Sequence, residues 1–311
     1  MKGRPETLAG VADVDCTGTQ ALVTGSTSGI GRSVALALGR LGADVIVHGR
    51  DSAAGEAVVD ELDEIGVDGT FLEADFANIA DVRDLAETVR ADTDGLDILL
   101  NNAGGLFRDG QLTDLGVEYT FHVNHLAPYL LTTELLEHFR ADARVVTTAS
   151  GAHRGASLSL ERTRSVERYS GLRAYSRSKL ANVLFASELA RRLEAADREI
   201  VSNSVHPGAI PGSGFARFLP GPIPALIQAF DSVPGVTSIA DGAAELLYLA
   251  VSPETADVSG RYFSSQQPRM PSRVARDLEA ATRLWRYSAD RLGIEEPLEA
   301  AVDEPTDAQS P

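Results

Sequence analysis

The sequence predicts an α/β fold in which a single parallel sheet is doubly wound, with helices on both of its faces. Short apolar segments alternate with longer segments of helical periodicity from Gln20 to Leu292. Such alternation is typical of parallel sheets, because right-handed crossovers place the helices on the two faces. The chain of 311 residues contains no internal repeat and no break in composition, so we predict one large domain.

Each element follows from its local pattern. The predicted strands, about seven in number, are short apolar runs between turn residues. They cover residues 21–24, 44–48, 70–72, 96–100, 144–148, 200–205 and 261–263. The predicted helices place apolar residues on one face. They cover residues 30–41, 52–65, 79–90, 115–140, 172–194, 238–250 and 273–292.

The predicted domain spans residues 19–295. Residues 1–18 should form a loose extension, and the acidic, Pro-containing residues 296–311 should be disordered. No segment approaches the ~20 apolar residues of a membrane span, and residues 1–9 lack the apolar core of a signal peptide. Cys16 is the only cysteine, which excludes an internal disulfide and a thiolate metal cluster, so we expect a cytoplasmic protein.

The formal net charge of −17 argues against binding to nucleic acid or to an anionic membrane surface. The acidic surface fits either high solubility or adaptation of the source to salt. The histidines His125, His153 and His206 do not have the spacing of a metal site. We therefore predict no metal and expect these histidines to be structural.

A glycine-rich turn, Thr24-Gly-Ser-Thr-Ser-Gly-Ile-Gly31, joins the first predicted strand to the first predicted helix. There Gly25 lets the backbone turn, while Gly29 and Gly31 let a pyrophosphate approach the amides of the helix N-terminus. We predict a dinucleotide site whose contacts are Gly25, Ser26, Ser28, Gly29, Ile30 and Gly31. After the fourth strand, small side chains would let the nucleotide lie over the sheet edge, at Asn102, Ala103 and Gly104.

The end of the second predicted strand indicates which dinucleotide binds. Sites that prefer NAD carry an acidic residue there, which binds the ribose hydroxyls. Here the position is Gly49, followed by Arg50, whose guanidinium suits a 2′-phosphate. We predict NADP(H); NAD(H) is the alternative, because a shift of one residue would bring Asp51 to the ribose. Asp75 follows the third strand and either binds the adenine amino group or caps the segment at Asn78.

Tyr175 and Lys179 indicate the chemistry of the site. A spacing of four places both side chains on one face of a helix, one turn apart. An ammonium beside a phenol favours the phenolate and lowers the tyrosine pKa, so Tyr175 can act as an acid and base near neutral pH. Lys179 is one of only two lysines in the chain. We predict a catalytic set of Asn124, Ser150, Tyr175 and Lys179.

Taken together, these motifs resemble the short-chain dehydrogenase/reductase family. The glycine-rich turn, Asn101–Gly104, the four catalytic residues and His206-Pro207-Gly208 occur in that family's order, over about residues 19–295. Segments such as Ala149-Ser-Gly-Ala-His153 and Arg283-Leu-Trp285 are similar to the retinol dehydrogenase and WW-domain-oxidoreductase branch. The resemblance implies a Rossmann fold and an NAD(P)-dependent alcohol dehydrogenase or carbonyl reductase.

The resemblance also implies a role for each residue. Tyr175 would exchange a proton with the substrate oxygen, and Ser150 would hydrogen-bond that oxygen as charge develops. Lys179 would lower the tyrosine pKa and bind the nicotinamide ribose, and Asn124 would hold a water that links it to solvent. The nicotinamide supplies the hydride, while the protein positions and polarises. Two further contacts with the cofactor are implied at Pro207 and Gly208.

Two features depart from the family pattern. The segment between Ser150 and Tyr175 is long for the family, although common in the branch, and its arginines suggest a solvated lid. The family often has a threonine after the Pro-Gly pair, whereas this chain has Gly212 and Ser213 there. The next residues form a Pro-rich loop that we expect either to cover an apolar substrate pocket or to make a subunit or core contact, with Phe215, Phe218, Leu219, Leu226 and Phe230.

Two other functions are compatible with a nucleotide site: a non-catalytic NADP(H)-binding regulator, which would usually lack the tyrosine or the lysine, and a nucleotide-sugar epimerase or dehydratase. The glycine spacing and the short C-terminal region argue against the latter. The family commonly forms dimers or tetramers through the helices at 115–140 and 172–194. The second offers an apolar face of Leu180, Val183, Leu184, Ser187 and Leu193. The alternative is a monomer in which the C-terminal helix and the segment before Tyr175 cover that face.

Overall fold

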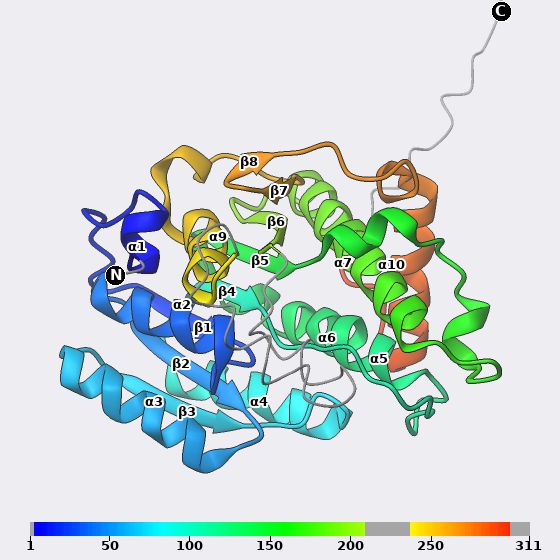
Figure 1. Ribbon diagram of the computed structural model, residues 1–311, viewed down its shortest axis with the longest axis horizontal. Helices are drawn as coiled ribbons and strands as arrows, with labels where there is room; N and C mark the ends of the chain where they lie inside the picture. Colours follow the sequence, from blue (N-terminus) through cyan, green and yellow to red (C-terminus); the bar gives the residue numbers. More distant parts are fainter. Residues whose placement is uncertain (1–2, 209–236, 299–311) are drawn as a thin grey trace, which may run out of the picture.

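A sheet of eight strands runs through the middle of the protein, between two layers of helices (Figure 1). The computed structural model describes residues 3–208 and 237–298. The strand order is β3-β2-β1-β4-β5-β6-β7-β8, and every pair of neighbours is parallel except β7 and β8. The strands are β1 (Gln20–Val23), β2 (Asp44–Gly49), β3 (Gly69–Glu73), β4 (Leu96–Asn101), β5 (Phe139–Thr148), β6 (Val201–His206), β7 (Tyr262–Ser264) and β8 (Gln267–Pro268).

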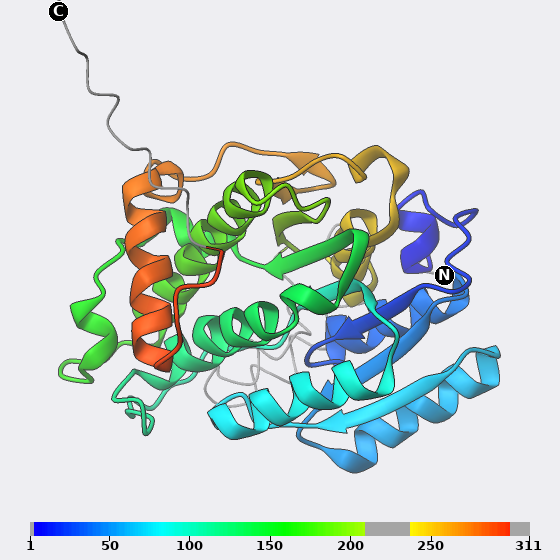
Figure 2. The ribbon, with the colours of Figure 1, turned by 180° about the vertical axis from the view of Figure 1, so that it is seen from behind.

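Helices cover both faces of the sheet, as Figures 1 and 2 show from opposite sides. The α-helices are α1 (Pro5–Leu8), α2 (Gly29–Arg40), α3 (Ser52–Ile65), α4 (Ile79–Asp92), α5 (Tyr119–Phe121), α6 (Ala127–Glu134), α7 (Gly171–Ala195), α9 (Ile239–Val251) and α10 (Leu278–Leu292). Ala21 and Val23 pack with α2, α3 and α9, whereas Leu22 packs with α4, α6 and α7. Successive strand residues point to opposite faces, so one strand serves two cores. The predicted doubly wound sheet is confirmed.

The strand order reverses between β1 and β4. The chain builds outward from β1 through β2 to β3, then crosses to β4 and builds in the other direction. At such a reversal the loops that follow the two central strands separate, which leaves a crevice at their carboxyl ends. The glycine-rich turn after β1 and residues 102–104 after β4 both lie at this edge.

Both predicted boundaries of the helix at residues 115–140 are wrong. It begins only after Glu118, whose buried carboxylate accepts two backbone N–H groups of the first turn. The following residues, His122–Leu126, form a π-helical turn. Pro128 has no N–H to donate to the carbonyl four residues earlier, which favours this break in the α-helical ladder. The helical stretch ends before Phe139, where β5 begins.

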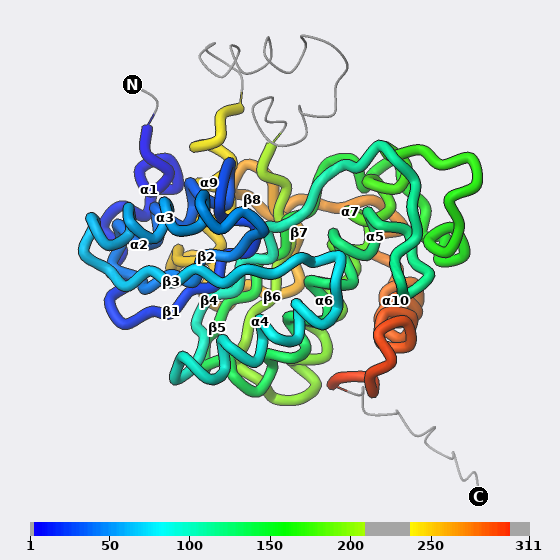
Figure 3. Tube along the Cα trace, turned by 90° about the horizontal axis from the view of Figure 1, so that it is seen from below, coloured from blue at the N-terminus to red at the C-terminus, as the bar shows by residue number. Residues whose placement is uncertain are grey.

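Residues 3–18 are ordered, so the expectation of a loose extension is wrong for this part of the chain. The carboxylate of Glu6 on α1 pairs with Arg40 on α2 at 2.6 Å. Ala9 and Val11 are buried in the same core as α2 and α9. Figure 3 shows α1 at one end of the molecule and α10 at the other. Among the described helices, none has the length and hydropathy needed to cross a membrane.

The segment between Ser150 and Tyr175 packs against the body of the protein, although its arginines are exposed. The carbonyl of Thr163 accepts the N–H of Glu118 at 2.6 Å, and its hydroxyl lies 2.5 Å from the hydroxyl of Tyr287 on α10. The segment is therefore hydrogen-bonded both to the start of α5 and to α10. It is not only the solvated lid that its composition suggests.

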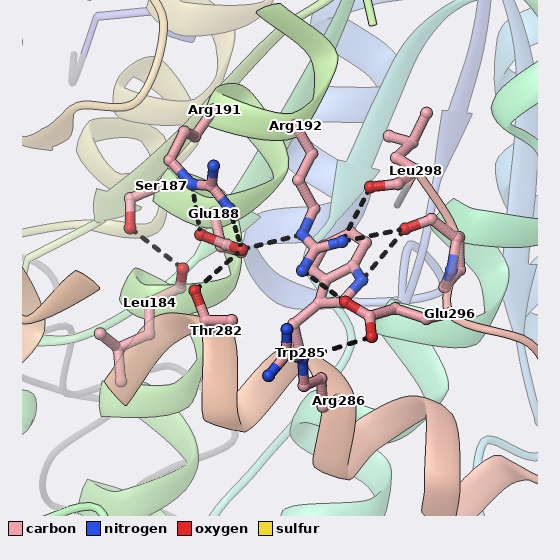
Figure 4. Close-up of polar contacts among 11 residues, drawn as sticks. Leu184, Ser187, Glu188, Arg191, Arg192, Thr282, Trp285, Arg286, Glu296 and Leu298 are labelled. Atoms are coloured by element: carbon pink, nitrogen blue, oxygen red, sulfur yellow. Dashed lines mark hydrogen bonds and ion pairs between the residues drawn. The ribbon is translucent and has the colours of Figure 1, made fainter. Parts of the chain in front are cut away.

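A buried ion cluster joins α7 to α10 and to the chain that follows it (Figure 4). Arg192 is fully buried, 2.8 Å from Glu188 and 2.6 Å from Glu296, and its guanidinium lies 4.7 Å from the ring centre of Trp285. It also donates to the carbonyl of Leu298 at 2.8 Å. These bonds hold the first residues of the predicted disordered tail in place; residues 299–311 lie outside the described part of the chain.

The apolar face of α7 that the sequence offered for subunit pairing is buried within one chain. Leu180, Val183, Leu184 and Leu193 are each at most 2% exposed. Helix α10 packs along α7, and residues of both helices belong to one apolar core. This part of α7 therefore has no free apolar surface for a second subunit.

Candidate active site

Tyr175 and Lys179 lie one turn apart on α7. The lysine Nζ donates to the carbonyl of Thr148, the last residue of β5, at 2.9 Å, and lies 5.7 Å from the centre of the Tyr175 ring. Burial lowers the pKa of Lys179 to about 8. The side chain therefore carries its charge at neutral pH, beside the phenol.

Ser150 follows β5 and is hydrogen-bonded to the side chain of Tyr175. Its Oγ also accepts the N–H of Ala152 at 3.2 Å, which orients the hydroxyl. Burial raises the pKa of Tyr175, and the hydrogen bond to Ser150 opposes that shift. The net shift of the Tyr175 pKa is therefore upward, because desolvation of the phenolate dominates, whereas the sequence led us to expect a lowering by Lys179.

Asn124 lies in the π-helical turn and is fully buried. Its side chain accepts the N–H of Gly105 and donates to the carbonyl of the same residue, both at 2.9 Å, and it also donates to Ser178 Oγ at 3.0 Å. A Cβ built on Gly104 would lie 2.7 Å from Asn124 Oδ1 and 3.7 Å from Lys179 Nζ. Asn124 thus ties the turn after β4 to α7 beside the lysine.

The side chain of His153 hydrogen-bonds to the backbone of Ser150. Its Nδ1 lies 2.7 Å from the carbonyl oxygen of Ser150, and its Nε2 accepts the N–H of Ser272 at 3.1 Å. Both nitrogens are used only if the ring is neutral with its proton on Nδ1. Within the described residues, no three potential metal ligands come together.

The glycine-rich turn leaves the start of α2 open. Gly25 and Gly29 have positive φ angles of 64° and 60°. A Cβ on Gly31 would lie 2.2 Å from the carbonyl oxygen of Gly25, so only glycine fits there. Ser28 is the N-cap but makes no side-chain cap, and the space beside Gly29 is open. Within the described part of the chain, the first amides of α2 therefore have no side-chain cap, which fits a pyrophosphate at the helix N-terminus.

Ser26 is not available as a cofactor contact. Its Oγ donates to the carbonyl of Val23 at 2.6 Å and accepts the N–H of His48 at 3.0 Å, while its own N–H donates to the carbonyl of His48. The side chain is fully buried. Because the turn is tight, the polar groups of this serine hydrogen-bond to the backbone of β1 and β2. The prediction that Ser26 contacts the cofactor is therefore wrong.

Thr24 and Asn102 fix the turn to the end of β4. The hydroxyl of Thr24 accepts the N–H groups of Asn102 and Ala103 at 2.9 and 3.0 Å. The Asn102 side chain donates back to the carbonyls of Thr24 and Gly25 at 2.9 and 3.2 Å. Asn102 is thus occupied with the loop itself. The sequence analysis did not identify this role of Thr24 in holding the loop after β4. The only signal for it in the sequence is a polar residue directly after an apolar strand.

At the end of β2, Arg50 supplies a positive charge, while Asp51 is engaged as a helix cap. The Asp51 side chain accepts the N–H of Ala54 as the N-cap of α3, at 3.1 Å. A Cβ on Gly49 would lie 2.5 Å from a methyl carbon of Thr27, so a larger residue has no room there. Arg50 lies 3.6 Å from Asp75; the arginine side chain is largely exposed and the aspartate side chain is partly exposed.

Asp75 serves partly as a turn residue. Its Oδ1 accepts the N–H of Ala77 at 3.0 Å, whereas Asn78 is the N-cap of α4. At the other end of the site, β6 ends at His206, and Gly208 has a φ of 95°. The apolar loop with Gly212 and Ser213 lies outside the described residues.

Comparison with known proteins agrees with this geometry. The family model described as short chain dehydrogenase matches residues 19–218. Human (Homo sapiens) retinol dehydrogenase 13 is 35% identical over 295 residues, which cover 90% of this chain and 86% of that protein. A crystal structure of an uncharacterized protein from Mycobacterium Paratuberculosis has a TM-score of 0.75 and 31% identity, covering 91% of this chain and 97% of that one.

A second crystal structure, of a short chain dehydrogenase from Burkholderia cenocepacia J2315 in complex with NADP, has a TM-score of 0.63 and 29% identity, covering 79% of this chain and 96% of that one. A family model that matches most of the chain and a relative that spans it together define its family. The chain belongs to the short-chain dehydrogenase/reductase family, in its retinol dehydrogenase-like branch, and is an enzyme that uses a nicotinamide cofactor.

Proposed function

We propose that this enzyme is an NADP(H)-dependent oxidoreductase that interconverts an apolar or partly apolar alcohol and its carbonyl compound, with Tyr175 as acid and base. The observation that carries this proposal is the arrangement of Ser150, Tyr175 and Lys179: a phenol hydrogen-bonded to a hydroxyl, with a buried ammonium 5.7 Å from its ring. The nicotinamide, when bound, supplies or accepts the hydride.

In the direction of reduction, Ser150 and Tyr175 both hydrogen-bond to the carbonyl oxygen of the substrate. Tyr175 donates its proton to this oxygen as negative charge develops there. Lys179 then stabilises the phenolate that remains. In the direction of oxidation, the phenolate removes the proton of the alcohol.

The preference for NADP(H) is supported by the residues at the end of β2. Arg50 is exposed and only loosely paired, so its guanidinium can turn to a 2′-phosphate. Asp51, which would bind the ribose in the NAD alternative, is engaged as a helix cap. The complex of the Burkholderia relative with NADP points the same way. NAD(H) remains the alternative cofactor.

The substrate class rests on two observations. The name of the human relative refers to retinol. The loop that follows Gly208 in the sequence is rich in apolar and aromatic residues, among them Phe215, Phe218 and Leu226. We infer from this composition that the substrate has an apolar or partly apolar body; the loop itself lies outside the described residues. A cytoplasmic location stays part of the proposal, on the ground that Cys16 is the only cysteine.

The test is turnover of a panel of aldehydes and ketones, with apolar chains of increasing length, by the native protein and by Tyr175→Phe. The variant keeps the ring but has no proton to give, so its rate should fall about 10²–10⁴-fold while NADPH still binds. Near-normal turnover by Tyr175→Phe would show that another group supplies the proton. A native protein that binds NADPH but turns over no compound of the panel would instead favour the regulatory alternative.

A further inference from the structure

His48 lies buried at the end of β2, between the glycine-rich turn and the end of β3. It is 3% exposed and belongs to none of the contacts that the sequence predicts. Its Nδ1 accepts the N–H of Gly25 at 3.1 Å, and its Nε2 lies 3.2 Å from the carbonyl oxygen of Ala74. The ring stacks on Phe76, with ring centres 4.5 Å apart. One side chain thus connects two of the loops that surround the nucleotide end of the site.

These partners assign the tautomer of His48. The backbone N–H of Gly25 can only donate, so Nδ1 must be unprotonated. The carbonyl of Ala74 can only accept, so the proton must be on Nε2. The ring is neutral in this arrangement, and burial agrees with it by lowering the pKa of His48 to about 4. A doubly protonated ring would present an N–H to the N–H of Gly25.

The backbone of His48 is bonded to the same turn. Its carbonyl accepts the N–H of Ser26 at 2.9 Å, and its N–H donates to Ser26 Oγ at 3.0 Å. The carbonyl of Gly25 is held separately by the side chain of Asn102, at 3.2 Å. The peptide groups on both sides of Gly25 are therefore fixed, and Gly31 packs directly on the carbonyl oxygen of Gly25. The direction of the first amides of α2 follows from these contacts.

We infer that His48 is a positioning residue for the adenosine and pyrophosphate end of the cofactor site. Through Nδ1 it sets the glycine-rich turn, and through Nε2 it sets the strand end that carries Asp75, the partner of Arg50. The inference rests on the proposed binding of a nicotinamide dinucleotide. The His48 ring is bonded to Gly25 and Ala74, whereas Tyr175 lies on α7, so the ring should act on cofactor affinity and leave the proton transfer step untouched.

Three substitutions separate the two ring contacts. His48→Asn places an amide oxygen where Nδ1 lies, so it can still accept the N–H of Gly25, but it is too short to reach Ala74. His48→Gln can reach Ala74 and loses the contact with Gly25. His48→Phe keeps a stacked ring and loses both bonds. His125→Phe is the matched control, because His125 is equally buried and bonds to Ser288 on α10, away from the turn.

Each protein is titrated with NADPH and with NADH by calorimetry, and its thermal unfolding is followed without cofactor. His48→Phe should raise the Kd for NADPH about 3- to 10-fold, the effect of losing the hydrogen bond to Gly25, which orients the glycine-rich turn. His48→Asn should recover most of this affinity, and His48→Gln should not. At saturating cofactor, kcat should be unchanged in His48→Phe. His125→Phe should lower the unfolding temperature without changing the Kd.

Equal affinity of the Asn and Gln variants would overturn the inference, and so would a Kd that simply follows the loss of stability across all four variants. These outcomes leave the proposed function intact, because the native protein would still bind its cofactor. A native protein that binds neither NADPH nor NADH would overturn the proposed function and this inference together.

Discussion

Replacing Arg50 with alanine should weaken the binding of NADPH and leave that of NADH unchanged. Arg50 lies 3.6 Å from Asp75, with side chains 61% and 42% exposed. Such an exposed pair contributes about 0–1 kcal/mol, so the guanidinium can leave it at little cost. A charge-assisted hydrogen bond to a phosphate contributes about 1.5–3 kcal/mol, or about 10- to 100-fold in affinity. Because Arg50 stays largely in solvent, we expect the lower end, about 10-fold.

Calorimetric titrations with both cofactors measure this directly. Arg83→Ala is a suitable control, because Arg83 is also a surface arginine, 47% exposed and 3.9 Å from its partner Glu134, but it lies on α4. Its removal should change neither Kd. Raising the ionic strength should narrow the difference between NADPH and NADH in the native protein, since salt screens an exposed charge pair.

Two results would refute this reasoning. A native protein that prefers NADH would mean that Asp51 leaves its capping position and binds the ribose. An equal loss of NADPH and NADH affinity in Arg50→Ala would mean that the arginine supports the loop and does not recognise the phosphate.

Three further predictions concern the catalytic lysine, the buried ion cluster and the surface of α7. Reduction should slow as the pH rises through about 8, where Lys179 loses the charge that stabilises the phenolate; a profile that stays flat well above that pH would contradict this role. Arg192→Leu removes the fully buried cation that bonds to Glu188 and Glu296, although Arg191 still pairs with Glu188 at 2.7 Å. The variant should cost about 1.5–3 kcal/mol in urea unfolding, the contribution of a hydrogen bond to a charged group, against almost nothing for Arg83→Ala; a similarly small loss would show that water reaches the cluster. Light scattering should give a mass near 33.0 kDa that dilution does not change, because α10 already covers α7; a dimer would require another surface.

The sequence by itself determined the doubly wound sheet and the edge at which the site residues gather. Alternation and helical spacing are properties of neighbouring residues, so the strands from β1 to β7 could be predicted to within a few residues, apart from the early start of β5. Parallel strands bring their carboxyl ends to one edge, which is why the turns at Gly25, Asn102 and Ser150 could be expected together.

Only the tertiary structure decided what each buried polar group bonds to and what covers each apolar face. Ser26 has the sequence context of a cofactor contact, but its hydroxyl is already hydrogen-bonded to the backbone N–H of His48 in β2. His48 bonds to Gly25 and to Ala74, residues that are distant along the chain and adjacent only in the sheet. The spacing of Leu180 and Leu184 shows that α7 has an apolar face, but not that α10 fills it. Periodicity reports which side of an element avoids water, whereas the partner on that side is set by packing across the whole chain.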